Sequence, residues 1–282
     1  MPSEAGPFLA VDVGGSSVKH GLVLDGRLEQ QEREPVARDL DGLVAQLTRI
    51  HAEAGEPDWG LAIAGLVDSQ RGVVHYASNL PLLDTPLLEL LPAPRVFAND
   101  LVAATVGEAG AGTLALLQAG TGIAGRFAHD GRVSARPYAG EVGHLRFRPG
   151  GLRCRCGQSG CAEAYGAWGG IVDRTAEAGR QEPTPASLLT TAEQDAWTRE
   201  VLDDALEAIG FAASALVAAY DPGTLRIGGG LAAAWGETLL AAIRRALGES
   251  VLPDLAARTA VEPATLGDAA PLLGLYRLGL EV

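Results

Sequence analysis

The stretch FLAVDVGGSSVKHGLVL, residues 8–24, decides the fold of this chain. Its halves, Phe8–Val13 and Ser17–Leu24, are short and mainly apolar, and the turn Gly14-Gly15-Ser16 joins them. Two such runs around a glycine turn predict a tight β-hairpin. Glycines let backbone amides approach phosphate oxygens, serine hydroxyls add donors, and an acid at a strand end, here Asp12, can hold hydrated magnesium. An ordinary β-turn would have the same sequence features.

The composition limits the classes of protein to consider. The chain has 282 residues, of which 47% are hydrophobic and 20% charged, as in a globular protein of one large or two ordinary domains. It carries 22 basic and 35 acidic side chains, a net charge of -13, which disfavours nucleic-acid binding because that requires clustered cations. Lys19 is the only lysine, and it lies in the glycine-rich hairpin.

The cellular location is predicted from what the sequence lacks. No apolar run approaches the roughly 20 residues of a membrane span, and the N-terminal segment has no basic start like that of a secretory signal. Three cysteines, an odd number, fall between Cys154 and Cys161, which argues against a secreted disulfide framework. We therefore expect a cytoplasmic protein without a membrane partner.

The rest of the chain alternates between predicted strands and helices. Apolar runs between turn residues predict strands at 59–64, 73–76, 95–98, 113–117, 122–128 and 224–227. Helical periodicity predicts helices at 39–54, 101–109, 191–220, 237–247 and 268–280. This alternation favours an α/β fold. The strand, glycine turn, strand pattern occurs twice, which suggests two lobes with one plan.

Two more glycine segments are candidate phosphate or nucleotide contacts. QAGTGIAGRF at 118–127 contains the turn Gly120-Thr121-Gly122, which repeats the design of the first hairpin. IGGGL at 227–231 follows a predicted strand, and its lack of side chains would let a flat adenosine lie against the backbone. A hairpin turn and a simple connection into a helix are the alternatives.

Asn99-Asp100 follows an apolar strand and is a candidate catalytic pair. A phosphoryl transferase needs a carboxylate that orients and deprotonates the acceptor hydroxyl. Helix capping would explain the same two residues without any catalytic role.

The segments AGEVGH at 139–144 and CRCGQSGCAE at 154–163 form the most specific motif. Three thiolates and one imidazole are a Cys3His set, which matches a closed structural zinc site with four protein ligands. The alternative is a group of buried reduced cysteines. Glu141 and Glu163 flank these ligands and could accept hydrogen bonds from sugar hydroxyls, or they could be solvated surface acids.

Taken together and in order, these segments resemble the ROK family of repressors, open reading frames and kinases, and most closely its bacterial glucokinase branch. DVGGSSVKHG at 12–21 is similar to the first phosphate motif of the family, and AGLVDSQRGVVHYASNL at 64–80 is similar to its PGPVD...G...NL segment. The resemblance continues through the Asn99-Asp100 pair, GTGIAG, GEVGH, CRCGQSGCAE and IGGGL, and so covers nearly the whole chain.

The resemblance implies an actin-like (ribonuclease H-like) α/β sugar kinase with two lobes, residues 1–110 completed by the helix 268–282, and residues 111–267. It implies that Asp100 is the base on the 6-hydroxyl of a hexose, most simply glucose, and that ATP with Mg²⁺ is the donor. The implied sugar contacts are Gly65, Asn79, Asn99, Asp100, Glu141, His144 and Glu163. The implied contacts to ATP and magnesium are Asp12, Gly14, Gly15, Ser16, Lys19, Gly120, Thr121, Gly122, Gly229 and Gly230. The implied ligands of a structural Zn²⁺ are His144, Cys154, Cys156 and Cys161.

Some features depart from the family pattern. Ser16 stands where threonine is usual, and Ala124 and Arg126 replace glycines of the second phosphate turn, where Arg126 could crowd the nucleotide or supply a cation. Leu101-Val102 replaces the usual Ala-Asn, and the segment 108–120 is shorter than in typical glucokinases.

Several alternatives stay open at this stage. Mannose, fructose, N-acetylglucosamine and N-acetylmannosamine are possible acceptors, and polyphosphate is a possible donor. A sugar-sensing regulator is a competing class, disfavoured because the first strand begins near Phe8 and leaves no room for a helix-turn-helix domain. Relatives of this kind lead us to expect a homodimer or homotetramer.

Overall fold

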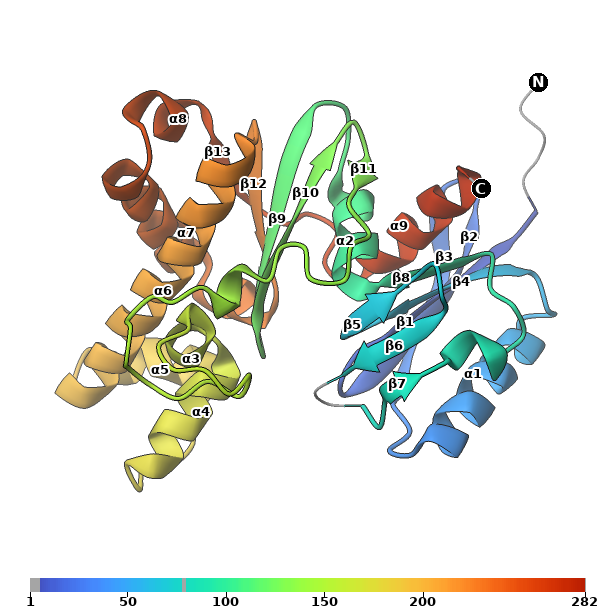
Figure 1. Ribbon diagram of the computed structural model, residues 1–282, viewed down its shortest axis with the longest axis horizontal. Coiled ribbons are helices and arrows are strands. Elements are labelled where there is room, and N and C mark those ends of the chain that lie inside the picture. Colours follow the sequence, from blue (N-terminus) through green and yellow to red (C-terminus); the bar gives the residue numbers. More distant parts are fainter. Residues whose placement is uncertain (1–5, 78–79, 282) are drawn as a thin grey trace. The chain divides into compact units, whose positions relative to one another are not determined.

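The computed structural model describes residues 6–77 and 80–281, which form two compact units (Figure 1). The first unit contains the residues up to Gly110, residues 130–139 and those from Leu266 onward. The second unit contains Ala111–His129 and Gly140–Thr265. Each unit has its own sheet and its own hydrophobic core.

The sheet of the first unit is built around the predicted hairpin. Its strands are β1 (Phe8–Val13), β2 (Ser17–Leu24), β3 (Arg27–Pro35), β4 (Asp58–Ile63) and β8 (Val96–Asn99), in the spatial order β3-β2-β1-β4-β8. β1 pairs antiparallel with β2 and parallel with β4, and β4 pairs parallel with β8. Every residue of β1 is buried, as expected for the central strand of a sheet with both faces covered.

Alternate residues of β1 enter two different cores. Leu9, Val11 and Val13 pack on the side of helix α1 (Leu40–Glu53). Phe8 and Ala10 pack on the opposite side, with residues of α2 (Asp100–Glu108) and α9 (Ala269–Leu280). The period of two along a strand produces this division. The remaining elements of the unit are the small sheet β5 (Leu66–Asp68), β6 (Val73–Tyr76) and β7 (Leu83–Thr85), and the 3-10 helix η1 (Leu87–Glu89). Residues 130–139, which are also part of this unit, include the short strand β11 (Arg132–Val133).

Helices α2 and α9 pack closely although about 160 residues separate them. A Cβ at Gly107 would overlap the carbonyl oxygen of Ala270, and one at Gly274 would overlap that of Ala103, so only glycine permits this approach. Arg277 Nη1 donates to the carbonyls of Val106, Gly107 and Ala109 at 2.8–3.0 Å. These bonds satisfy the last carbonyls of α2, which have no partners inside the helix.

The second unit repeats the strand plan with different helices. Its strands β9 (Thr113–Ala119), β10 (Ile123–His129), β12 (Thr224–Gly228) and β13 (Ala260–Pro263) include an antiparallel β9–β10 hairpin, and β12 is parallel to both β9 and β13. The helices are η2 (Val142–His144), α3 (Ala162–Gly166), α4 (Trp168–Glu177), α5 (Pro185–Ala192), α6 (Ala196–Tyr220), α7 (Gly230–Ser250) and α8 (Pro253–Arg258). The long helices α6 and α7 provide most of the core that covers this sheet.

The predicted continuous helix over 191–220 is wrong. The chain forms α5, leaves the helical path after Ala192, and begins α6 at Ala196. Asp195 is the reason, since its carboxylate accepts hydrogen bonds from Thr198 N at 2.8 Å and Thr198 Oγ1 at 2.6 Å and so caps a new helix. The helix predicted at 237–247 begins earlier, at Gly230, with an interruption at Gly236, where φ is 48°.

The sequence also missed several elements. β3 is a mostly exposed strand of charged and polar residues, so it lacks the apolar alternation by which strands are recognised.

Both predicted hairpins are confirmed, as are the helices that follow Asp39 and Asn99 and the final helix. Among the described residues, none of the helices has the length and apolar character needed to cross a membrane.

Candidate functional site

The hairpin of the first unit places one acid and one lysine side by side. Asp12 and Lys19 are opposite each other in the β1–β2 register, and Lys19 Nζ lies 3.5 Å from Asp12 Oδ2. Asp268, just before α9, receives the same ammonium group at 3.0 Å. No sequence pattern identifies Asp268 as a partner of Lys19, because an acid at a predicted helix start is common at the surface.

Asp12 is almost fully buried, and its Oδ1 has no hydrogen-bond partner among the residues that the structure describes. Burial and, to a smaller extent, the charge of Asp100 raise its pKa to about 7, against the opposite effect of Lys19. An orphaned carboxylate oxygen at the end of a strand fits a group that receives a hydrated cation.

Asn99 and Asp100 divide two tasks at the start of α2. Asn99 Oδ1 caps the helix by accepting from Leu101 N and Val102 N, each at 3.1 Å. Asn99 Nδ2 donates to the carbonyl of Gly65 at 2.9 Å and to Asp100 Oδ1 at 2.9 Å. The capping interpretation is therefore correct for Asn99. The Asp100 carboxylate is oriented by two hydrogen bonds at Oδ1, one from Asn99 Nδ2 and one from Leu101 N at 2.8 Å, so it shares one amide of the helix start with Asn99.

Gly65 is a further predicted site residue whose position requires glycine. Its φ is 130°, and a Cβ there would overlap the carbonyl oxygen of Tyr76. Its hydrogen bond to Asn99 brings two of the predicted sugar contacts together. Asn79, predicted to be a third, lies outside the described residues.

The glycine segments of the second unit meet at the carboxyl ends of β9 and β12. Gly120 N donates to Gly122 O at 3.0 Å and closes the turn. Gly229 has φ 92°, and a Cβ there would overlap the carbonyl of Ala119, while a Cβ on Gly120 would lie 3.5 Å from Gly230 N. Carboxyl ends of parallel strands and the N-terminus of a long helix, here α7, are where α/β proteins bind phosphates.

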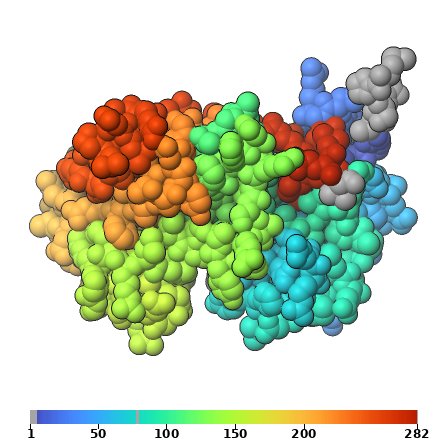
Figure 2. All heavy atoms as spheres, turned by 45° about the horizontal axis from the view of Figure 1, so that its top comes forward, coloured from blue at the N-terminus to red at the C-terminus, as the bar shows by residue number. Residues whose placement is uncertain are grey.

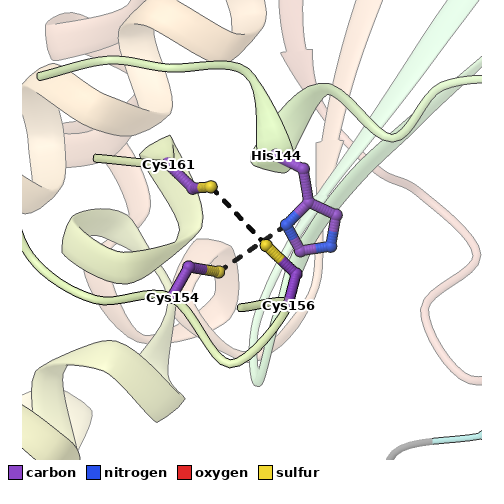
Figure 3. A group of neighbouring side chains, drawn as sticks. All are labelled: His144, Cys154, Cys156 and Cys161. Carbon is purple, nitrogen blue, oxygen red and sulfur yellow. Dashed lines mark hydrogen bonds between the residues drawn. The ribbon is translucent and has the colours of Figure 1, made fainter. Parts of the chain in front are cut away.

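The predicted cysteine and histidine ligands converge in the second unit. The ligand atoms of His144, Cys154, Cys156 and Cys161 all lie within 4.8 Å of one another. Figure 3 shows the four side chains pointing to one centre, with His144 Nδ1 3.7 Å from Cys154 Sγ and Cys156 Sγ 3.7 Å from Cys161 Sγ. Zn–S bonds of about 2.3 Å in a tetrahedron give S–S separations of about 3.8 Å, so the donor set and its spacing fit zinc.

The three thiols differ in pKa: the values of Cys154 and Cys161 are raised, whereas the pKa of Cys156 is lowered because hydrogen bonds with the Gln158 backbone and the other two thiols outweigh its burial. Burial raises the pKa of Cys154 to about 12 and also raises the pKa of Cys161. Without a cation these groups stay protonated near neutral pH, and metal binding would release their protons.

Two carboxylates lie next to the imidazole of His144. Glu163 Oε1 is 3.9 Å from Nδ1, and Glu141 Oε2 is 3.9 Å from Nε2. Glu163 Oε2 also accepts from Ile123 N at 3.0 Å, so this acid contacts the strand that follows the turn Gly120–Gly122. Neither acid is a freely solvated surface group.

The structure also answers the question raised by Arg126. Its side chain is buried, and its Nη1 would lie 2.9 Å from a Cβ at Gly140. The guanidinium thus packs against the start of the segment that carries Glu141 and His144. Arg126 lies within β10, opposite Leu116 of β9, and so is not part of the turn Gly120–Gly122.

Solved structures show the same fold. A ROK hexokinase from Thermus thermophilus matches with a TM-score of 0.79 and 30% identity, over 98% of this chain and 100% of the other. A ROK family glucokinase from Streptomyces griseus, in complex with glucose and AMPPNP, matches with a TM-score of 0.78 and 26% identity over 98% and 100% of the two chains. The predicted actin-like α/β fold is confirmed, and the class is an ATP-dependent sugar kinase.

The sequence comparisons identify the family. The family model described as "ROK family" matches residues 8–281, and the chain belongs to this family. It is 29% identical to a glucokinase of Halalkalibacterium halodurans over 95% of this chain and 93% of that protein. It is also 28% identical to an N-acetylmannosamine kinase of Vibrio vulnificus, over 81% and 84%, and 27% identical to a kanosamine kinase of Amycolatopsis mediterranei, over 96% and 95%.

Proposed function

We propose that this protein transfers the γ-phosphoryl group of ATP to the 6-hydroxyl of a hexose, with glucose as the leading acceptor. The observation that carries the proposal is the arrangement at the start of α2, where Asn99 takes the capping role and also orients the Asp100 carboxylate. A base that must accept a proton from an alcohol needs this kind of fixed orientation.

In this mechanism Asp100 accepts the proton of the 6-hydroxyl as the oxygen attacks the γ-phosphorus, and ADP leaves. Asp12 would hold Mg²⁺ through water, and the cation would supply charge neutralisation on the phosphates. Lys19 and the amides of the turns Gly14-Gly15-Ser16 and Gly120-Thr121-Gly122 would position the phosphates. Gly229 and Gly230, at the start of α7, would accommodate the adenosine.

His144, Glu141 and Glu163 are the proposed hydroxyl-binding groups of the second unit. The Nδ1 atom of His144 faces the cysteines, so Nε2 is the nitrogen left for a sugar hydroxyl. Zinc would be structural, since three cysteines and the histidine complete a tetrahedron and leave no position for water activation. Gly65, Asn79 and Asn99 are the proposed contacts of the first unit.

Glucose leads because the glucokinases of Halalkalibacterium halodurans and Thermotoga maritima match 95% of this chain at 28–29% identity. The N-acetylmannosamine kinase makes an N-acetylated amino sugar the second candidate, because its identity over the matched part is the same as that of a glucokinase. These percentages do not separate the acceptors, so the acceptor must be decided by experiment.

The deciding experiment is ADP release with Mg²⁺ and ATP on glucose, mannose, fructose, N-acetylglucosamine and N-acetylmannosamine. We expect the highest kcat/KM on glucose. A tenfold or greater preference in kcat/KM for another sugar would overturn the assignment of glucose as the acceptor. Turnover on none of the five sugars would overturn the proposed reaction. The Asp100→Asn variant controls for a contaminating kinase.

Two further features are part of the proposal. We expect a homodimer or homotetramer, which light scattering of the purified chain would measure. We also expect a cytoplasmic location, where ATP is available and where Cys154, Cys156 and Cys161 would remain reduced, as they are in the structure.

A further inference from the structure

The segment from Leu145 to Cys161, called the zinc loop below, carries all three cysteines on irregular backbone. Within it the chain forms only isolated bridges, Arg146 with Cys161 and Arg153 with Ser159. Much of the loop is exposed, and atoms of this yellow-green part of the chain lie at the surface in Figure 2. A loop of this kind needs contacts outside itself to keep three thiols in one place.

Arg148 joins the loop both to itself and to α6, which the loop also contacts through the rings of Phe147 and Phe211. Its N donates to Gly160 O at 3.0 Å, directly before Cys161, and its O accepts from Gly151 N at 2.9 Å. Its guanidinium lies 4.8 Å from the ring centre of Phe147 and 5.1 Å from that of Tyr165. Nη1 is 2.6 Å from Asp204 Oδ1.

Asp204 lies in the middle of α6, and its side chain is only 9% exposed. A buried carboxylate is costly unless cations and hydrogen bonds compensate it. Here two arginines do so, because Arg174 Nη1 binds Asp204 Oδ2 at 2.5 Å while Arg148 binds the other oxygen. Glu207 also pairs with Arg148, at 3.0 Å, but it is 56% exposed.

Arg174, in the last turn of α4, extends this network to the helix whose other end contacts the turn Gly120–Gly122. The first turn of α4 has no side-chain cap. Instead Trp168 N and Gly169 N donate to the carbonyls of Gly120 and Thr121 at 2.8 and 3.3 Å. One buried carboxylate therefore joins the loop that carries the cysteines to the helix that supports a glycine turn.

We propose that Asp204 is a positioning residue that orders the zinc loop, through Arg148, before any metal or sugar binds. The inference rests on the proposed function, in which the zinc loop shapes the sugar site at His144. The reason is energetic. An exposed ion pair contributes little, but here the carboxylate is buried and each of its oxygens is paired with an arginine. Loss of Asp204 leaves Arg174, which is 16% exposed, without this partner and releases the loop that is held through Arg148, whose own side chain is 42% exposed.

The test uses two variants of the full chain, Asp204→Asn and Arg148→Gln, and the matched acid-to-amide control Glu207→Gln on the same arginine. Hydrogen exchange of the metal-free protein is measured first. We expect amides of residues 147–160 to exchange about tenfold faster in both variants and unchanged in the control. Arg148→Gln leaves the Arg174–Asp204 pair intact, so it remains informative if Asp204→Asn fails to fold.

Zinc affinity, measured by competition with a chromophoric chelator, is the second readout. We expect about tenfold weaker zinc binding in both variants, a similar rise in sugar KM and a kcat within about threefold of wild type. Unchanged exchange and unchanged zinc affinity in both variants would overturn the positioning role. A wild-type chain that binds no zinc would overturn the metal site, and the exchange data would still decide the role of Asp204.

A double-mutant cycle of Arg148→Ala and Asp204→Ala separates this role from general destabilisation. If the two residues act as one unit, the double variant binds zinc no more weakly than the weaker single variant. Strictly additive losses would show that they act independently and would contradict the proposal.

Discussion

The hairpins β1–β2 and β9–β10 have the same backbone plan and different chemistry. Each is followed in its sheet by two parallel strands, β4 and β8 in the first unit and β12 and β13 in the second. Asp12, the penultimate residue of β1, is opposite Lys19. The penultimate residue of β9 is Gln118, and it is opposite Ala124. The shared backbone arrangement determines where the turn and the strand ends lie, and the side chains at those positions determine their chemistry.

The difference extends to what each unit adds to its hairpin. The first unit supplies acids, with Asp12 and Asp100 close enough for their charges to interact. The second supplies glycines at two strand ends and a cluster of cysteines on a loop. We expect loss of a side chain in the first unit to affect the chemical step, and loss in the second to affect binding.

The largest expected effect is that of Asp100→Asn. If Asp100 is the base, kcat should fall by roughly 10³-fold while the sugar dissociation constant changes little. Steady-state kinetics and calorimetric sugar titration measure the two quantities. Asp41→Asn, at an exposed position of α1, is the control. A kcat within tenfold of wild type would contradict the assignment.

The pKa of Asp12 predicts a dependence of stability on pH. Its folded pKa of about 7 is above the ordinary 3.8, so the protonated carboxyl favours folding. That stabilisation is complete below about pH 4 and is lost as the pH rises through about 7. Asp12→Asn should therefore be more stable than wild type at pH 8 without metal, by at most about 4 kcal/mol, and show little difference at low pH.

Urea unfolding of both proteins at pH 5 and pH 8, with chelator present, measures this difference. Added Mg²⁺ should stabilise wild type at pH 8 and have little effect on the variant. An equal stability difference at the two pH values would show that Asp12 does not titrate in this range.

Removing one of the proposed zinc ligands should have a smaller effect, mainly on binding. Cys156 is exposed, so Cys156→Ser should leave the core intact. We expect about one zinc per wild-type chain and none in the variant, with sugar KM raised about 10- to 100-fold and kcat reduced less. Elemental analysis and kinetics measure these changes. Normal sugar binding by a zinc-free variant would show that zinc does not shape the sugar site.

The smallest expected effect is at the helix that completes the first unit. Arg277→Lys cannot reproduce the three hydrogen bonds to the end of α2, so we expect a loss of about 1 to 2 kcal/mol in unfolding free energy. Arg27→Lys, at an exposed position of β3, is the control. Equal unfolding free energies for wild type and Arg277→Lys would show that the capping contributes nothing measurable.

The sequence was informative where the deciding interactions are local. Both hairpins depend on glycine turns within a few residues, and the Cys3His cluster depends on closely spaced ligands and one nearby segment. The break before α6 was missed because its cause is one capping acid, Asp195, inside an otherwise helix-forming segment. Asp204 and Asp268 could not be identified, because their importance depends on arginine and lysine partners brought near by folding.

The packing of α9 against α2 has a consequence for the order of events during synthesis. The first unit needs Leu266 and the residues after it, which the ribosome adds only after the whole of the second unit has been made. Until then the face of α2 around Gly107 is uncovered, and the carbonyls at the end of the helix lack the hydrogen bonds from Arg277. The unit whose translation begins first is therefore completed last. A nascent chain that carries a complete second unit still lacks α9, which packs against the helix that begins with Asp100.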